Sequence, residues 1–443
     1  MPFRISIHDY EIDQLFRRFR YIIGESNWRQ RIKKLEEEIR GNKFLRHHLL
    51  QENDIAYQLN HCSNLERQYG ALPVGRMDLS PVYPALAFVS HCLSTLDRMD
   101  AENRTRAIGR IQGAFRNPED MRALQLEFTV GLHFAKLGHR LAWPELETGG
   151  DTYDLLVEDL GPKGLEIECK AISEEKGRRI PTRHALEFWN LMQRDLLAAT
   201  RGLHGGLSIV ITLPGKLPSN FTERKELAKL VARTILTGHS QIYPQATISI
   251  HDFDAQMLAD IDWNNAGPGT RELIQSITGT TNRQAMVTGL KGGGAVICVI
   301  QSSQDDSLFD AIQKTAKRAA TRQLTGNRPG LILLEFGGMS PEGMVSLAEH
   351  DNIPGNAPTG LRRWASEFLS NCTDRDHIVG IGFLSRGTMR RPSSNVVTSS
   401  GSAYVFPRRD SSQWNEAFSG LFNQESEFAK QSADSLALSL QET

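Results

Sequence analysis

The chain has 443 residues, of which 40% are hydrophobic and 23% charged; this composition is ordinary for a folded globular protein and excludes a disordered, collagen-like or disulfide-dense chain. At about 150 residues per domain, the length predicts two or three domains. The net charge is −1, from 51 basic and 52 acidic residues, so any nucleic-acid partner has to meet a local basic surface rather than the field of the whole chain.

Residues 1–117 are expected to form a mostly helical region. Apolar residues between Leu15 and Ile23 recur at helical spacing. The basic residues of 17–34 are followed by three glutamates at 36–38, which indicates a solvated helix with ion pairs four residues apart. A nucleic-acid-binding arm is the alternative interpretation of the same charges.

Residues 118–215 are expected to form one α/β domain. Asn117, Pro118 and the two acids after them mark the start of a helix that ends near Gly138. Short strands separated by turn residues are then predicted at 139–146, 152–158 and 164–172. A helix over 182–200 and a strand over 207–213 complete the order helix, three strands, helix, strand.

Residues 216–425 are expected to form a further α/β region, and residues 426–443 a polar tail. Apolar runs predict strands at 295–300, 330–336, 378–384 and 403–406. Helices are predicted at 224–236, 306–324 and 360–371. The pattern leaves open whether this region is a separate domain or extends the first sheet.

The predicted strand at 164–172 has an unusual charge pattern. Strand alternation puts its apolar side chains on one face and Glu166, Glu168 and Lys170 on the other. Charges buried in a sheet must pair or meet an ion, because an unpaired buried charge is costly. The alternative interpretation is an exposed edge strand that carries a Glu–Lys pair.

Asp154 lies in the preceding strand, and a hairpin of this length brings it near Glu168. Two carboxylates on adjacent strands form an oxygen-rich site suited to Mg²⁺ or Mn²⁺. Lys170, two residues further along the same face, can contact a phosphate oxygen or a metal-bound water. Asp154 is alternatively an ordinary aspartate at the end of a hairpin.

Glu127 is a lone carboxylate on the apolar stripe of the helix that starts at Pro118. Its neighbours on that stripe are Ala123, Leu124, Val130, Gly131 and Phe134. We interpret Glu127 as a buried acid that points at the metal site, with Gly131 allowing a close approach. A glutamate that reaches solvent from the flank of the helix is the alternative.

This arrangement resembles the PD-(D/E)XK nuclease superfamily, whose fold is restriction-endonuclease-like. The resemblance lies in Asp154, thirteen intervening residues and Glu168-Cys169-Lys170, in an αβββαβ order with a mixed sheet over residues 118–215. Glu127 resembles the first-helix acid of many members. One departure is Tyr153, which stands where the family's proline precedes the acid.

The resemblance implies a metal-dependent phosphodiesterase. Asp154 and Glu168 would bind Mg²⁺ or Mn²⁺, the Ile167 carbonyl would be a backbone ligand, and Glu127 would join the coordination of the metal. Lys170 would orient or help deprotonate the attacking water and stabilise the transition state. This agrees with the chemistry, because phosphodiester hydrolysis needs a hydroxide-like nucleophile and charge neutralisation.

Two basic segments are candidates for holding nucleic acid. Lys176, Arg178, Arg179 and Arg183 follow the metal-binding strand and are expected to bind flanking phosphates. A solvated loop that offsets nearby glutamates is the alternative. The predicted helix at 306–324 carries further cations and precedes a strong strand, so it resembles the second core helix of some such nucleases and would imply a large insertion in the fold.

We therefore expect a cytoplasmic Mg²⁺-dependent nuclease that cuts DNA, of the prokaryotic defence or restriction type. The cytosol is favoured by the cysteines, which are scattered and number five, and by a start that does not resemble a secretory signal. The lack of an apolar run of about 18 residues favours no membrane partner. Cutting both strands of a duplex would favour a homo-oligomer or a partner protein. The alternatives are a non-catalytic nucleic-acid-binding or scaffold protein and a small-molecule phosphodiesterase.

Overall fold

The computed structural model describes residues 3–144, 146, 152–259, 261, 268–280, 283–290, 293–393 and 396–422, so the expected tail at 426–443 lies outside the described residues. The chain forms two compact units. Unit 1 comprises Met1–Lys34, Glu52–Lys176 and Phe309–Thr443, and unit 2 comprises Leu35–Gln51 and Gly177–Leu308. In the part of the chain that is described, no helix combines the length and the apolar character needed to cross a membrane.

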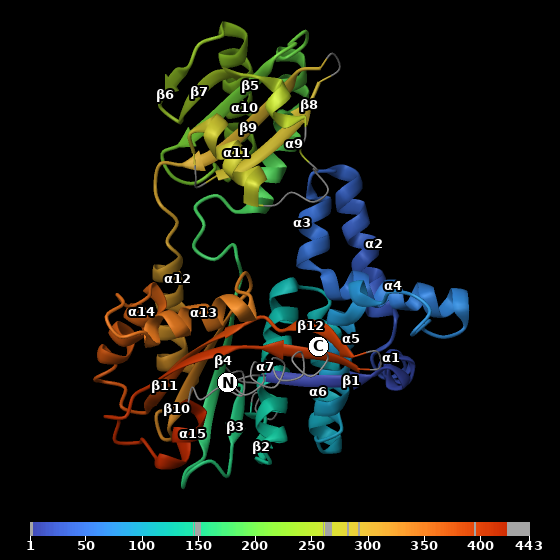
Figure 1. Cartoon of the computed structure of the whole chain (residues 1–443), viewed down its shortest axis with the longest axis vertical. Helices are drawn as coiled ribbons and strands as arrows, with labels where there is room; N and C mark the ends of the chain where they lie inside the picture. Colours follow the sequence, from blue (N-terminus) through green and yellow to red (C-terminus); the bar gives the residue numbers. More distant parts are fainter. Residues whose placement is uncertain are drawn as a thin grey trace, which may run out of the picture. The chain divides into compact units, whose positions relative to one another are not determined.

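Unit 1 is built on a six-stranded sheet in the order β14-β11-β10-β4-β3-β2 (Figure 1). The strands are β2 Leu141–Ala142, β3 Leu155–Val157, β4 Leu165–Ile172, β10 Gly330–Phe336, β11 Ile378–Ser385 and β14 Ala403–Pro407. Strands β2, β3 and β4 form an antiparallel meander, as predicted. Strands β4, β10 and β11 are parallel, and β14 is antiparallel to β11. The sheet is therefore mixed, which confirms the α/β class.

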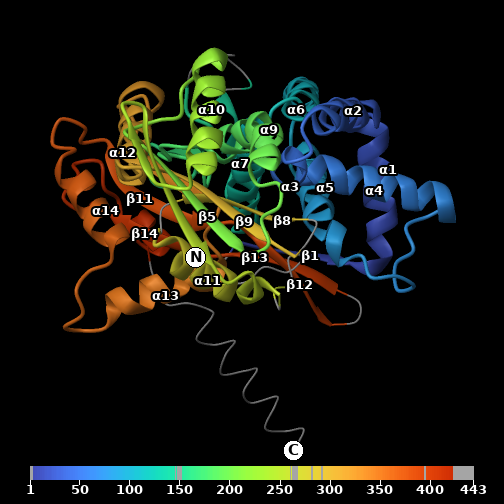
Figure 2. The same cartoon turned by 90° about the horizontal axis from the view of Figure 1, so that it is seen from above.

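Helices cover both faces of this sheet. One face, which includes Leu165, Ile167 and Cys169, packs in a core with α7 (Pro118–Lys136) and the N-terminal helices. The other face packs with α12 (Leu308–Arg318), α13 (Pro341–Asn352) and α14 (Gly360–Ser370). Figures 1 and 2 show α12 and α14 grouped on the opposite side of unit 1 from α4, α5 and α6. Unit 1 thus has three layers.

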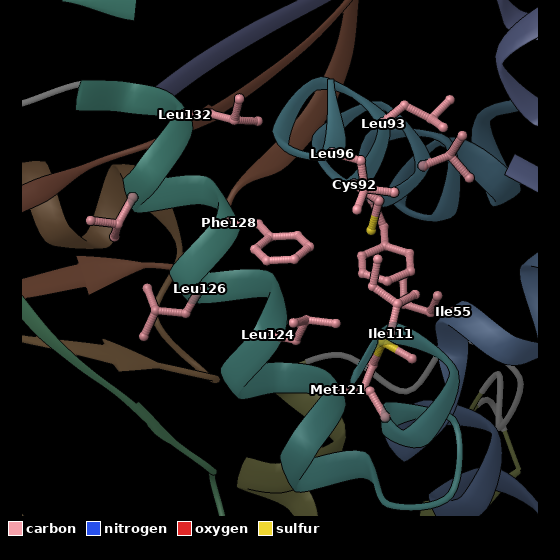
Figure 3. Close-up of a cluster of buried hydrophobic side chains, with 14 of the residues drawn as sticks. Ile55, Cys92, Leu93, Leu96, Ile111, Met121, Leu124, Leu126, Phe128 and Leu132 are labelled. Atoms are coloured by element: carbon pink, nitrogen blue, oxygen red, sulfur yellow. The ribbon is translucent and has the colours of Figure 1, made fainter. Parts of the chain in front are cut away.

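Helix α7 begins as its sequence predicts, because the Asn117 side chain accepts a hydrogen bond from the Glu119 amide and Pro118 occupies the first turn. The helix is buried on two sides. Figure 3 shows Met121, Leu124 and Phe128 pointing toward a cluster of side chains from the neighbouring helices, whereas Leu126 points to the opposite side. This double burial fixes the helix between the N-terminal helices and the sheet.

The N-terminal region is mostly helical, as predicted. Its helices are α1 Asp9–Ile23, α2 Ser26–Gly41, α3 Leu45–Glu52, α4 Asp54–Tyr69, α5 Tyr83–Leu96 and α6 Ala101–Ala114. Strand β1 (Phe3–His8) was not expected; it joins a second sheet with β12 (Thr388–Ser393) and β13 (Val396–Gly401) in the order β1-β13-β12. Its partner lies almost 400 residues away, so no local pattern identifies the pairing.

The arginines of α1 form ion pairs, but only the pair of Arg17 with Asp13 has the predicted spacing of four residues, and the pairs of Arg18 and Arg20 reach other parts of the chain. Arg17 lies 2.8 Å from Asp13, and Arg18 pairs with Asp97. Arg20 pairs with Glu66 of α4. These cations therefore hold helices together rather than forming a free arm.

Unit 2 contains a five-stranded sheet in the order β6-β7-β5-β9-β8. Its strands are β5 Gly206–Leu213, β6 Gln241–Tyr243, β7 Ala246–Phe253, β8 Arg283–Gly289 and β9 Ala295–Ser302. Its helices include α9 Thr182–Ala199, α10 Phe221–Thr237 and α11 Pro268–Thr278. The two faces of this sheet bury separate apolar cores, so unit 2 has its own hydrophobic interior.

The expected continuous domain over 118–215 is corrected by this topology. The helix at 182–200 and the strand at 207–213 do form, as α9 and β5, but β5 pairs with β7 and β9 in unit 2. The parallel neighbour of β4 is β10, with Ile167 opposite Leu331, and the helix before β10 is α12. Residues 330–336, 378–384 and 403–406 thus extend the first sheet after an insertion. Both β5 and β10 are buried apolar runs, so pattern alone cannot tell which one pairs with β4.

Candidate active site

Strands β3 and β4 bring the two predicted metal-binding acids together. Leu155 pairs with Ile167 and Leu156 with Glu166, so Asp154, directly before β3, comes next in register to Glu168. Asp154 Oδ2 accepts a hydrogen bond from the Cys169 amide at 2.7 Å. The relative exposure is 6% for Asp154 and 0% for Glu168. Both acids therefore lie at one point on the same face of the sheet.

Lys170 forms an ion pair with Glu168, and 27% of its side chain is exposed. Burial lowers the pKa of Lys170, but the negative charges of Glu168, Asp154 and Glu127 outweigh burial and raise this pKa above its ordinary value. All three predicted acids thus act on the ammonium. At neutral pH Lys170 is therefore a cation that can hold a negative group.

Cys169 faces the opposite side of β4 and is buried in the core, as predicted. Burial raises the pKa of its thiol well above the ordinary value, and the charges of Asp154, Glu127 and Glu168 raise it further. A thiol that stays protonated is a poor nucleophile. Cysteine-based catalysis is therefore not supported at this position.

Glu127 on α7 is buried at 2% exposure, as the buried-acid interpretation predicts. Both of its carboxylate oxygens bind the guanidinium of Arg110 on α6, at 2.6 and 2.7 Å. Arg110 was not singled out from the sequence. The signal that could have found it is the need of a buried carboxylate for a cation, but that need does not say which of the many arginines supplies it.

Glu166 shares a face of β4 with Glu168 but belongs to a different contact. Its carboxylate accepts hydrogen bonds from the amide of Thr325, at 2.8 Å, and from the Thr325 hydroxyl, at 2.5 Å. Burial raises the pKa of Glu166, and these hydrogen bonds oppose the shift. Glu166 thus fixes the segment that leads into β10. Ile167 lies between Leu155 and Leu331 inside the sheet, with its side chain in the core.

The four basic residues after β4 do not form one free group. Lys176 is exposed at the end of a unit 1 segment, whereas Arg178, Arg179 and Arg183 belong to unit 2. The backbone amide of Arg179 donates to Asp306 at 2.8 Å, and its side chain donates to the Asp305 carbonyl at 3.1 Å. These contacts tie the two chain segments at the edge of unit 2 together.

Arg183 lies 2.8 Å from Glu38 and 3.1 Å from Glu187, so both of its ion pairs are within unit 2. Its charge is offset by two carboxylates. This favours the structural alternative over phosphate binding for Arg183.

The donor set fits a hydrated Mg²⁺ ion rather than a closed protein cage. Among the described residues, no three or more His, Cys, Asp or Glu side chains are arranged to hold a metal. Asp154 and Glu168 provide two carboxylates, and Mg²⁺ commonly binds one or two carboxylates and completes its octahedron with water and substrate phosphates. Glu127 is already bound by Arg110 and is less suited to direct coordination.

No protein-family model, curated protein or solved structure matches this chain.

Proposed function

We propose that unit 1 is a metal-dependent nuclease that hydrolyses phosphodiester bonds, with DNA as its substrate. The observation that carries this proposal is the meeting of Asp154 and Glu168 from adjacent strands beside the ammonium of Lys170. Two buried acids beside a partly exposed cation are costly for folding alone. The same set suits a phosphodiester, which needs charge neutralisation and an activated water.

The topology supports a restriction-endonuclease-like core for this site. When residues 177–308 are set aside as an insertion, the chain order is α7, β2, β3, β4, α12, β10. This is the αβββαβ order that the acid-acid-lysine motif implies, with α12 and β10 in the positions first expected for α9 and β5. The proposed core thus consists of residues from both sides of the insertion.

In the proposed mechanism Asp154 and Glu168 would hold Mg²⁺ or Mn²⁺. When bound, the ion would supply charge neutralisation and a water of lowered pKa. The Ile167 carbonyl remains a predicted backbone ligand. Lys170, paired with Glu168, would orient or help deprotonate the attacking water and stabilise the negative charge on the phosphate. Glu127, held by Arg110, supports the ammonium from α7.

The proposed nuclease is tested by incubating the purified chain with plasmid, linear duplex, single-stranded DNA and RNA, each with Mg²⁺ or with EDTA. Cleavage that needs Mg²⁺ and is lost in Glu168→Ala is expected. Glu175→Ala, a nearby acid outside the site, is the control and should cleave normally. Cleavage that persists in EDTA, or that Glu168→Ala retains, would contradict the mechanism.

A nucleic-acid-binding protein without catalysis is the second candidate. The observation in its favour is the complete burial of Glu168 together with its ion pair to Lys170, which a structural role also explains. The same assay separates the two functions. Binding of nucleic acid without cleavage under any metal condition would favour the second candidate.

A further inference from the structure

The segment from α12 into the π-helical turn η3 (Ala319–Gln323) has two different sides. Its apolar side is buried in the same core as Ile172 and Ile332 of the unit 1 sheet. The opposite side is exposed and carries four cations, which we call the cationic face: Lys314, Lys317, Arg318 and Arg322. The acid of this segment, Asp310, lies at its first turn.

Three of these cations are available to a partner. In the part of the chain that the structure describes, Lys314, Lys317 and Arg322 have no carboxylate within ion-pair distance. This differs from α1 and from Arg183, whose cations are offset by acids. A row of exposed cations without acidic partners creates a positive potential that favours a polyanion.

The cationic face belongs to the helical layer of unit 1 that packs on the same sheet face as the side chains of Glu168 and Lys170. Helix α12 packs on the sheet face that carries Glu168 and Lys170, since Ile172 of β4 shares its core. Leu324, just after η3, packs on Gly330 at the start of β10, and Thr325 binds Glu166 near the start of β4. The helix therefore runs antiparallel to β4. Lys314 is consequently nearer than Arg322 to the C-terminal end of β4, where Lys170 lies.

The dimensions of this face suit a phosphate backbone. At 1.5 Å per residue, the cations from Lys314 to Arg322 extend over roughly 12 Å. A DNA strand advances about 3.4 Å per phosphate along the duplex axis, so about three or four phosphates would fit beside them. Single π-helical turns such as η3, which are wider than an α-helical turn, are also frequently found at functional sites.

We infer that the cationic face of α12 and η3 seats the sugar-phosphate backbone of the nucleic acid and leads it toward Lys170. This inference rests on the proposed nuclease function. It differs from the earlier expectation that Lys176, Arg178, Arg179 and Arg183 hold the substrate. Of that group only Lys176 belongs to unit 1, and Arg183 is offset by two carboxylates, whereas Lys314, Lys317 and Arg322 are all in the unit of the acids and have no carboxylate within ion-pair distance among the described residues.

The test measures binding of a fluorescent DNA duplex to the full chain in EDTA, over a series of salt concentrations. The variant Lys314→Gln/Lys317→Gln/Arg322→Gln is expected to bind about tenfold or more weakly. Its salt slope should fall by about two to three, because each lost phosphate contact removes roughly 0.9 from the slope. Unchanged affinity and slope would overturn the inference.

A control with the same change of charge lies on α10, which exposes three cations at helical spacing, Lys225, Lys229 and Arg233; unlike the α12 cations, Lys229 is paired with Glu226. Their triple glutamine variant should bind DNA as the wild type does. An equal loss in both triple variants would overturn the inference, since total charge would then explain the effect. The charge-keeping variant Lys314→Arg/Lys317→Arg/Arg322→Lys should bind normally, and weak binding by this folded variant would also count against the cationic face.

The inference and the proposed function fail in different ways. If the wild type cleaves DNA with Mg²⁺ and the α12 variant binds normally, the inference alone is wrong. If the wild type binds through α12 and never cleaves, the nuclease proposal is wrong and the binding surface remains. A wild type that neither binds nor cleaves overturns both.

Discussion

The ion pair between Glu168 and Lys170 defines the chemistry at the residue scale. In Lys170→Ala, the cation that we propose to meet the water or the phosphate is lost, while Asp154 and Glu168 remain. Removing such a group typically lowers the rate by about 10² to 10⁴-fold, so cleavage should almost disappear. DNA affinity in EDTA should change little. Single-turnover cleavage and binding measured on the same preparation check this, and full activity of Lys170→Ala would refute the role of Lys170.

The Arg110–Glu127 pair makes a prediction about stability. Arg110→Ala leaves the buried carboxylate of Glu127 without its main cation, and breaking a buried ion pair in this way typically costs about 3–5 kcal/mol. Arg110→Met combined with Glu127→Leu removes both charges and should recover most of this loss. Urea unfolding of the three proteins measures it. A double variant as unstable as Arg110→Ala would show that packing, not charge, is responsible.

Glu335, near the end of β10, lines a cavity of about 80 Å³ with His91 and His133. Burial raises the pKa of Glu335 to about 7, although Arg386 and Arg122 oppose the shift. Burial lowers the pKa of His91 to about 3 and that of His133 to about 4, so both rings are neutral above pH 5.

This carboxyl should make the chain less stable as pH rises. The folded chain keeps the Glu335 proton up to about pH 7, whereas an unfolded glutamate loses it near pH 4.5. Between these two pH values, rising pH therefore stabilises the unfolded form relative to the folded form. Glu335→Gln removes this contribution. From pH 5 to pH 8, the free energy of unfolding should therefore fall more in the wild type than in the variant. Parallel pH profiles in urea unfolding would exclude a protonated Glu335 in the folded chain at pH 5.

At the scale of elements, the approach of α7 to Trp143 gives a further prediction. A Cβ atom at Gly131 would lie 2.8 Å from the Trp143 ring, so Gly131→Ala should destabilise the fold by about 1–3 kcal/mol. Gly109→Ala on α6 meets no atom within 4 Å and should instead stabilise by roughly 0.5–1 kcal/mol. Thermal unfolding compares the pair, and equal effects would contradict the close packing of Gly131. The sequence predicts that Gly131 allows a close approach beside Glu127, and the group that approaches is the Trp143 ring.

Local features of the elements could be predicted because their signals are close together in sequence. The start of α7, the meander β2–β4 and the convergence of Asp154 on Glu168 depend on fewer than 60 residues. The pairing of β4 with β10 could not be predicted, because β5 offers an equally apolar strand earlier in the chain. Arg110 and Thr325 were missed for the same reason: tertiary packing, not spacing, assigns a partner to a buried acid.

On the scale of the whole molecule, separate cores predict separate unfolding. Unit 1 and unit 2 bury different apolar clusters, so calorimetry should resolve two transitions. Ile332→Ala in unit 1 and Ile209→Ala in unit 2 should each lower one transition, since truncating a buried isoleucine costs about 2–5 kcal/mol. A single transition lowered by both variants would show that the units unfold together.

The insertion between β4 and β10 has a consequence for synthesis on the ribosome. Strand β4 ends at Ile172 and its neighbour β10 begins only at Gly330. At about 5–20 residues per second, synthesis of the residues between the two strands takes roughly 8–30 seconds, and β4 cannot pair with β10 before then. During that time one edge of β4 has no partner, and an open apolar edge invites association with other chains. Charged side chains on a strand disfavour such pairing, so Glu166, Glu168 and Lys170 would reduce association of β4 with other chains until β10 has been synthesised.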